Sequence, residues 1–205
     1  MIGRVLKRSS DHAVLLRSLY NPGRSCGRSS PQLVAGWRDP GQLEPPLRPG
    51  GKRDFRYLTG LLAQPLAVLG DYAPAKPVYH CEVRAAPGDL ELGDDAWMRI
   101  ANEIMHRIGL SRYGEEDEAV RWVAVHHGDN HIHIVATLAR QNRRRARLDN
   151  DYYRIREALQ AMEVEYGLRR VARAGQGNAA GAPREGRPGP SRRRRPGPAG
   201  PGRPG

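Results

Sequence analysis

Cysteine and long apolar runs are the features that this sequence most plainly lacks. It has two cysteines, Cys26 and Cys81, among 205 residues. Two cysteines are too few for a disulfide framework, so a reducing, intracellular compartment is expected. No stretch approaches the roughly 18 apolar residues that span a bilayer. The N-terminal segment also lacks the apolar core of a secretory signal. The sequence therefore predicts a cytoplasmic protein without a membrane partner.

Acidic residues are scarce mainly at the C-terminal end. The chain carries 34 Lys and Arg against 22 Asp and Glu, a net charge of +12. Residues 168–205 contain ten Arg and one Glu, a net charge of +9, which leaves +3 for residues 1–167. The same segment contains seven Pro and nine Gly, and such a composition cannot bury enough apolar area to offset the entropy of ordering. We therefore expect residues 171–205 to be a disordered tail.

The remaining part, residues 1–170, carries strand and helix signals without an internal repeat, which predicts one α+β domain. Residues 21–53 are rich in Pro, Gly, Arg and Ser and are expected to form a long irregular loop with some order around Leu33, Val34 and Trp37. A helix is expected to start at Asp54 and to end at Pro65, and another is expected to be capped by Asp94. Alternating apolar residues predict strands near 2–6, 78–85, 121–127 and 131–138. Further helices are expected near 11–20 and 151–166.

Histidine is concentrated in one short stretch, W-V-A-V-H-H-G-D-N-H-I-H-I-V, which starts at Trp122. Residues i and i+2 of a strand point to the same face, so His131 and His133 lie side by side. A turn near Gly128 would bring His127 alongside them, whereas His126 points to the opposite face. Asp129 is close enough in sequence to accept an N–H from one of these rings.

Three imidazoles on one hairpin predict a divalent metal site with open coordination positions. Zn, Mn, Fe, Co and Ni all accept such ligands. An isolated strand histidine is most often only a hydrogen-bonded or exposed side chain, but the H-x-D-x-H-x-H spacing favours a metal. His80 and Glu82 share one face of another strand. They either line the same site or form the exposed polar face of a half-buried strand.

The stretch H-H-G-D-N-H-I-H-I-V resembles the third motif of relaxases, the mobilization nucleases of the HUH endonuclease superfamily. Weaker similarity extends over about residues 1–170 and includes L-L-R-S-L-Y-N-P-G-R, P-V-Y-H-C-E-V-R-A and L-G-D-D-A-W. The sequence resembles relaxases from high-GC actinobacterial mobile elements.

The resemblance implies an α+β fold with about five antiparallel strands flanked by helices. His127, His131 and His133 would be the metal ligands, and Asp129 would be the acidic residue of the motif. Mg or Mn is the expected ion, with Zn, Ni and Co as alternatives. The implied activity is site-specific and strand-specific nicking of single-stranded DNA at a transfer origin in plasmid or mobile-element conjugation. It proceeds through a 5′-phosphotyrosyl intermediate, and accessory mobilization proteins are possible partners.

The resemblance places the nucleophilic tyrosine near the end of the first helix, where this chain has Tyr20. The family often has a tyrosine two residues earlier, at the position of Ser18. Tyr20 is the expected nucleophile, and the alternative is that it only packs as a helix-end aromatic residue.

Arginines that follow the histidine strand are expected to hold the phosphates that flank the scissile bond. They are Arg140, Arg143, Arg144, Arg145 and Arg147. A solvated basic loop is the alternative, and the run Arg192–Arg195 in the tail could add sequence-independent DNA affinity.

Two other functions stay open. One is a truncated, inactive relaxase remnant that still binds DNA and metal, and the Pro/Gly/Arg tail would fit a shifted reading frame. The other is a basic RNA-binding or structural protein whose histidines are incidental.

Overall fold

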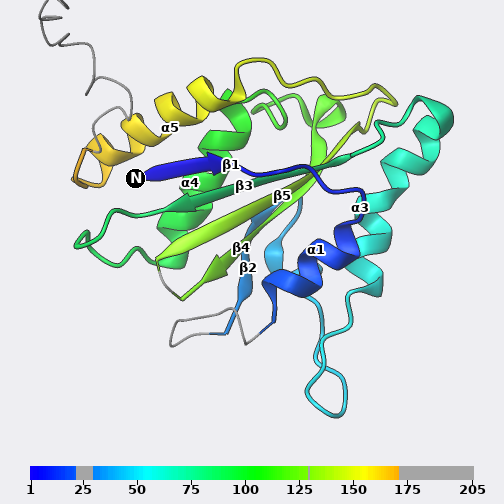
Figure 1. The fold of residues 1–205 in the computed structure, drawn as a ribbon, viewed down its shortest axis with the longest axis horizontal. Coiled ribbons are helices and arrows are strands. Elements are labelled where there is room, and N and C mark those ends of the chain that lie inside the picture. Colours follow the sequence, from blue (N-terminus) through cyan, green and yellow to red (C-terminus); the bar gives the residue numbers. More distant parts are fainter. Residues whose placement is uncertain (22–29, 129, 171–205) are drawn as a thin grey trace, which may run out of the picture. The chain divides into compact units, whose positions relative to one another are not determined.

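The computed structural model describes residues 1–21, 30–128 and 130–170. At its centre is a five-stranded antiparallel sheet with the strand order β1-β3-β5-β4-β2 (Figure 1). The strands are β1 (Ile2–Val5), β2 (Gln32–Gly36), β3 (Val78–Arg84), β4 (Val120–His127) and β5 (His131–Arg140). The expected α+β fold with about five antiparallel strands is confirmed. The tail that was expected to be disordered, residues 171–205, lies outside the described residues.

Helices cover both faces of this sheet (Figure 1). They are α1 (His12–Leu19), α2 (Pro40–Leu43), α3 (Arg56–Leu69), α4 (Asp94–Arg107) and α5 (Asp151–Glu165), with 3-10 turns η1 (Gly70–Tyr72) and η2 (Glu116–Glu118). One apolar cluster joins α4 and α5 to the face that carries Tyr79, Cys81 and Val83 of β3. A second cluster joins α1 and α3 to the face that carries Val78. None of the described helices combines the length and the apolar character that crossing a membrane requires.

Alternation along the central strands separates two chemically different faces. On β3, the residues facing α4 and α5 are apolar and buried, whereas His80, Glu82 and Arg84 lie on the other face. Cross-strand pairing continues this second face, because Glu82 lies opposite His133 and Arg84 lies opposite His131. His80, Glu82, Arg84, His131 and His133 therefore lie at one end of a single face of the sheet.

Within residues 21–53, where a long irregular loop with some order around Leu33, Val34 and Trp37 was expected, the structure is more regular than predicted at residues 32–36. These residues form β2, an edge strand that pairs with β4, and α2 follows it. Its sequence, Gln32–Gly36, lacks polar alternation because Leu33, Val34 and Ala35 are all buried, on both faces of the strand. A strand covered on both faces has no period of two in its sequence, so the pattern did not reveal it.

The expectation that a helix ends at Pro65 is wrong. Helix α3 continues to Leu69, with Pro65 inside it. Proline has no N–H to give to the carbonyl four residues earlier, which is that of Leu61. Arg121 of β4 donates to this carbonyl instead, at 2.6 Å. The acceptor is satisfied from outside the helix, and the helix can pass through the proline.

The helix starts agree with the capping residues only in part. Asp11 caps α1 and accepts hydrogen bonds from the backbone N–H groups of Ala13 and Val14. Helix α4 is capped by Gly93, and Asp94, the expected cap, is its first residue. The Asp94 carboxylate instead accepts a hydrogen bond from Gln32 at 2.6 Å, which links α4 to the edge strand β2.

Candidate metal centre

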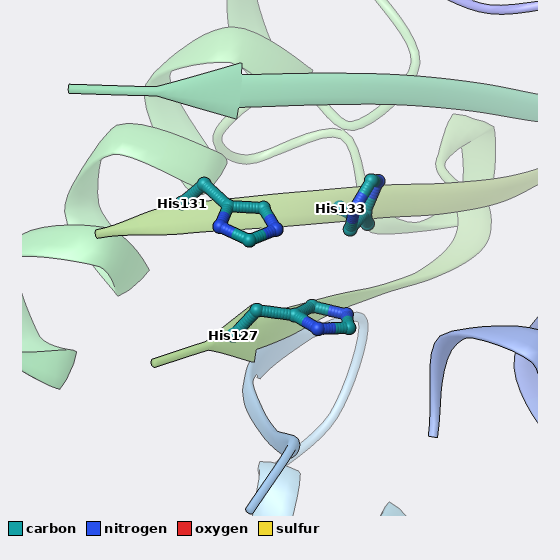
Figure 2. A group of neighbouring side chains, drawn as sticks. All are labelled: His127, His131 and His133. Carbon is teal, nitrogen blue, oxygen red and sulfur yellow. The ribbon is translucent and has the colours of Figure 1, made fainter. Parts of the chain in front are cut away.

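Three histidines converge where β4 and β5 meet in a hairpin. His127 lies directly opposite His131, and His133 lies opposite Val125. Their ring centroids are separated by 4.9 Å (His127–His131), 5.0 Å (His127–His133) and 5.2 Å (His131–His133). One possible ligand atom from each residue lies within 4.8 Å of the other two, and Figure 2 shows the rings grouped between the strands. We call these residues the histidine cluster.

The environment of the cluster favours neutral imidazoles. His127 is 4% exposed and His131 is 7% exposed. Burial lowers the pKa of His133 to about 2, with the neighbouring His80, His127, His131 and Arg84 adding to the effect. Metal ligation requires a nitrogen lone pair, so a ring that stays neutral at physiological pH is suited to it. Three nitrogen donors with room for further ligands fit a divalent transition metal.

The fourth histidine of the motif is separate from this cluster, as its position in the strand predicts. His126 Nδ1 lies 2.7 Å from the Asp94 carboxylate of α4, and its ring lies 5.9 Å from that of Trp97. Both contacts are on the face covered by α4. Asp129, the expected acidic residue of the motif, lies outside the described residues.

A different histidine completes the surroundings of the cluster. His80, on β3, has its Nε2 atom 3.0 Å from Nδ1 of His133. His80 is 8% exposed, and burial lowers its pKa to about 4, with Glu82 opposing the shift. Of the two readings open for His80 and Glu82, the exposed polar face therefore does not apply to His80. Glu82 is less deeply buried and pairs with Arg84 at 3.4 Å.

Tyr20 lies at the end of α1 in a polar network that the sequence did not predict. Its hydroxyl donates to the Glu44 carboxylate at 3.0 Å, and Arg53 donates to the same carboxylate at 2.6 Å. The Arg53 guanidinium also lies over the Tyr20 ring, 5.1 Å from its centroid. We call Tyr20, Glu44 and Arg53 the helix-end cluster. Glu44 and Arg53 fall in a segment without periodicity, so no sequence signal could have identified them.

The Tyr20 phenol is strongly disposed to keep its proton. Tyr20 is 9% exposed, and its ring packs edge-on against Phe55 at 5.2 Å. Burial raises the pKa of Tyr20 well above its usual range, and Glu44 raises it further. Ser18, where the relaxase pattern often has tyrosine, donates its hydroxyl proton to the Leu15 carbonyl at 2.7 Å.

The sheet relates this cluster to the histidines. Glu44 accepts a hydrogen bond from the backbone N–H of Leu33 at 2.7 Å, and Leu33, Val125 and His133 are successive partners across β2, β4 and β5. Two strand spacings separate Leu33 from His133, a backbone distance of about 10 Å. Glu44, which accepts the Tyr20 hydrogen bond, is thus bonded to the residue that lies in the same cross-strand row as His133.

An open cavity of about 580 Å³ lies beside the helix-end cluster. Tyr20 and Phe55 contribute aromatic surface to its wall, and Arg17, Lys52 and Arg53 contribute positive charge. No carboxylate belongs to the described residues that line it. A cavity with this lining suits a ligand that combines negative charge with an apolar surface.

The arginines that follow β5 do not adjoin the histidines. His131 and His133 are at the start of β5, whereas Arg140 is its last residue, seven residues after His133. At the usual rise of a strand, that separation is roughly 23 Å. Arg140 also donates to the backbone carbonyls of Glu118 and Gly109. Arg140 therefore lies far from the histidine cluster along the strand, and its expected contact with DNA stays a prediction.

The other arginines of this segment face solvent. Arg143, Arg144, Arg145 and Arg147 are exposed, and Arg143 adopts a positive φ of 63° in the turn after β5. Their expected contact with DNA stays a prediction.

Comparison with known families matches residues 68–168 to the relaxase family, described as "MobA/VirD2-like, nuclease domain". The resemblance to relaxases is confirmed. The match covers 101 of the 205 residues, from the last turn of α3 to just after α5. The relaxase segment therefore includes the histidine cluster and His80, whereas Tyr20, Glu44 and Arg53 precede it. No curated protein and no solved structure matches the chain.

Proposed function

We propose that this protein is a metal-dependent relaxase that nicks one DNA strand at a transfer origin and stays covalently attached to it. The observation that carries the proposal is the histidine cluster, whose ligand atoms lie within 4.8 Å of one another, inside the segment that matches a relaxase nuclease domain. Single-stranded DNA would be the substrate, and plasmid or mobile-element transfer in the cytoplasm would be the setting.

His127, His131 and His133 would hold the divalent ion. The ion would supply Lewis-acid polarisation of a non-bridging oxygen of the scissile phosphate. Mg or Mn is our preferred ion on the strength of the family, while the nitrogen-only ligands also accept Zn, Ni or Co. Burial lowers the pKa of His133 to about 2, so this ring stays neutral and can donate a lone pair at physiological pH.

Tyr20 would be the nucleophile. Its hydroxyl oxygen would attack phosphorus while the bond to the 3′ oxygen breaks, giving a 5′-phosphotyrosyl protein and a free 3′-OH. Glu44 is positioned to accept the phenol proton, because it already accepts the Tyr20 hydrogen bond at 3.0 Å. Arg53 would hold Glu44 in place through its 2.6 Å contact. The positively lined cavity beside Tyr20 offers a path for the strand's phosphates.

Covalent capture of DNA tests this proposal. A pool of random-sequence single-stranded oligonucleotides is incubated with the protein, with Mn²⁺ or Mg²⁺ or with EDTA, and adducts that resist SDS are counted. We expect adducts only with metal and none from Tyr20→Phe. Tyr57→Phe, which changes an exposed tyrosine on α3, is the matched control and should behave as the parent does. Undiminished capture by Tyr20→Phe would exclude Tyr20 as the nucleophile.

The second candidate function is an inactive remnant that binds metal and DNA. The observation in its favour is the state of Tyr20, which is buried and bonded to a carboxylate, together with the serine at position 18. A protein that binds metal and oligonucleotides but never forms an adduct would support the remnant. A protein that binds no metal would instead favour the third reading, a basic protein with incidental histidines.

A further inference from the structure

His80, on the neighbouring strand β3, contacts the histidine cluster directly. The hydrogen bond between its Nε2 atom and Nδ1 of His133 is 3.0 Å long, and the two ring centroids lie 5.1 Å apart. Figure 2 shows one ring nitrogen of His133 directed towards His127 and His131, and the other directed towards the neighbouring strand. His133 is therefore held between the cluster on one side and β3 on the other.

A hydrogen bond between two imidazole nitrogens needs one proton between them. If His133 Nδ1 carries this proton, its Nε2 keeps a lone pair that can bind a metal. If His80 Nε2 carries it instead, neutral His133 must carry its own proton on Nε2, and no nitrogen of His133 is left for a metal. The direction of this one bond thus decides whether the cluster has three donors or two.

We infer that His80 is a positioning residue, which accepts a hydrogen bond from Nδ1–H of His133 and thereby keeps Nε2 of His133 free to bind a divalent metal. Partners of metal-bound histidines commonly fix the tautomer and the ring orientation in this way, although carboxylates and carbonyls are the usual acceptors. Here Glu82, which lies directly opposite His133 in the sheet, is paired with Arg84, and His80 makes the contact. The inference rests on the metal site of the proposed function.

The register of the sheet explains why His80 reaches His133. His80 pairs with Val135, two residues after His133 on the same face. The contact is therefore diagonal across the β3–β5 pair, at a separation that long or aromatic side chains can bridge. His80 is buried, so water does not readily replace it as the acceptor.

The tautomer of His133 can be read directly by ¹⁵N NMR of the imidazole rings in the metal-free protein. We expect the Nδ1–H form to dominate in the parent and in His80→Gln, because the amide oxygen of glutamine also accepts a hydrogen bond. In His80→Leu, which has no acceptor, the Nε2–H form should gain population. An Nε2–H tautomer in the parent, or identical tautomers in the Leu and Gln variants, would overturn the inference.

Zinc affinity provides the second measurement. Loss of a partner of a ligating histidine typically weakens metal binding about 10–100-fold, so His80→Leu should lose that much and His80→Gln only a small part of it. His106→Leu, which changes a half-buried histidine of α4 outside the histidine cluster, is the control and should bind zinc as the parent does. Zinc bound through Nδ1 of His133 would contradict the inference. Because the tautomer is measured without metal, failure of the parent to bind any metal would count against the proposed function and not against His80.

Discussion

The histidine cluster and the helix-end cluster are the two halves of the proposed site, and they differ in how the chain assembles them. The histidines come from one hairpin, seven residues from first to last, and the two-residue repeat of a strand puts them on one face. Tyr20, Glu44 and Arg53 come from a helix end and from two points of the connection between β2 and α3. A local arrangement can be predicted from spacing, whereas one assembled by tertiary contacts cannot.

Removing two of the proposed metal ligands should give the largest difference between the two clusters. The double variant His131→Ala/His133→Ala should lose more than the roughly 100-fold in metal affinity that marks the loss of a partner residue. The helix-end cluster should stay intact, with the Tyr20 phenol titrating as in the parent. Calorimetric titration with Mn²⁺ or Zn²⁺ measures the metal affinity, and ¹³C NMR of the tyrosine ring measures the titration of the Tyr20 phenol.

The control for this variant is His106→Ala/His126→Ala, which removes the same number of imidazoles from outside the cluster. His126 contacts Asp94 on the other face of the sheet, so metal affinity should stay near that of the parent. An equal loss of affinity in both double variants would mean that the histidines act only through stability.

His12 is a buried histidine outside both clusters, and it tests whether burial without a metal site also affects stability. His12 Nε2 lies 2.8 Å from the Thr137 hydroxyl, which itself donates its proton to the Leu62 carbonyl. The hydroxyl can therefore only accept from His12. Burial lowers the pKa of His12 to about 4, with Asp11 opposing the shift.

Because this folded-state pKa lies below the unfolded value of about 6.5, the unfolded chain binds the proton more tightly. The stabilisation is complete above about pH 6.5 and is lost as the pH falls towards 4, with an upper size on the order of 3 kcal/mol. Urea unfolding at pH 7.5 and at pH 4.5 should show a smaller difference for His12→Gln than for the parent. Tyr57→Phe, which changes an exposed residue of α3, is the control and should keep the full difference.

Changing Glu44 alters the helix-end cluster alone. Burial and the Glu44 charge both raise the pKa of Tyr20. Glu44→Gln removes the charge but not the burial, so the pKa of Tyr20 should fall but stay above that of free tyrosine. Loss of charged hydrogen bonds to Arg53 and Leu33 should lower the free energy of unfolding by about 1–3 kcal/mol. Metal affinity should be unchanged, and a loss there would contradict the separation of the two clusters.

The smallest effect is expected at the far end of β5. Replacing Arg143, Arg144 and Arg145 together by alanine should leave metal affinity unchanged. If all three contact phosphates, the slope of log affinity for single-stranded DNA against log salt should fall by about 2. Arg99→Ala, an exposed arginine on α4, is a single-site control for the effect of removing surface charge. An unchanged slope in the triple variant would assign these arginines to a solvated loop.

The strands of the histidine hairpin and helix α4 could be predicted because each has a strong period and clear ends. Residues 32–36 could not, because burial on both faces removes the polar positions that reveal a strand. The role of His80 could be predicted only in part. Its strand face was predictable, but the partner on that face depends on the register of β3 against β5, which no local pattern encodes. Arg140 follows the histidines closely in sequence, but the length of β5 separates it from them in space.

The proline in α3 has a consequence for how local opening would occur. Because Pro65 has no N–H, the Leu61 carbonyl has no donor within the helix and accepts a hydrogen bond from Arg121 of β4. The next carbonyl, that of Leu62, accepts a hydrogen bond from Thr137 of β5. Directional contacts from both central strands thus hold one turn of this helix. Amide hydrogens of α3 around Pro65 should therefore exchange with solvent together with those of β4 and β5. Proline usually interrupts a helix, but here it couples the opening of α3 to the opening of the central strands.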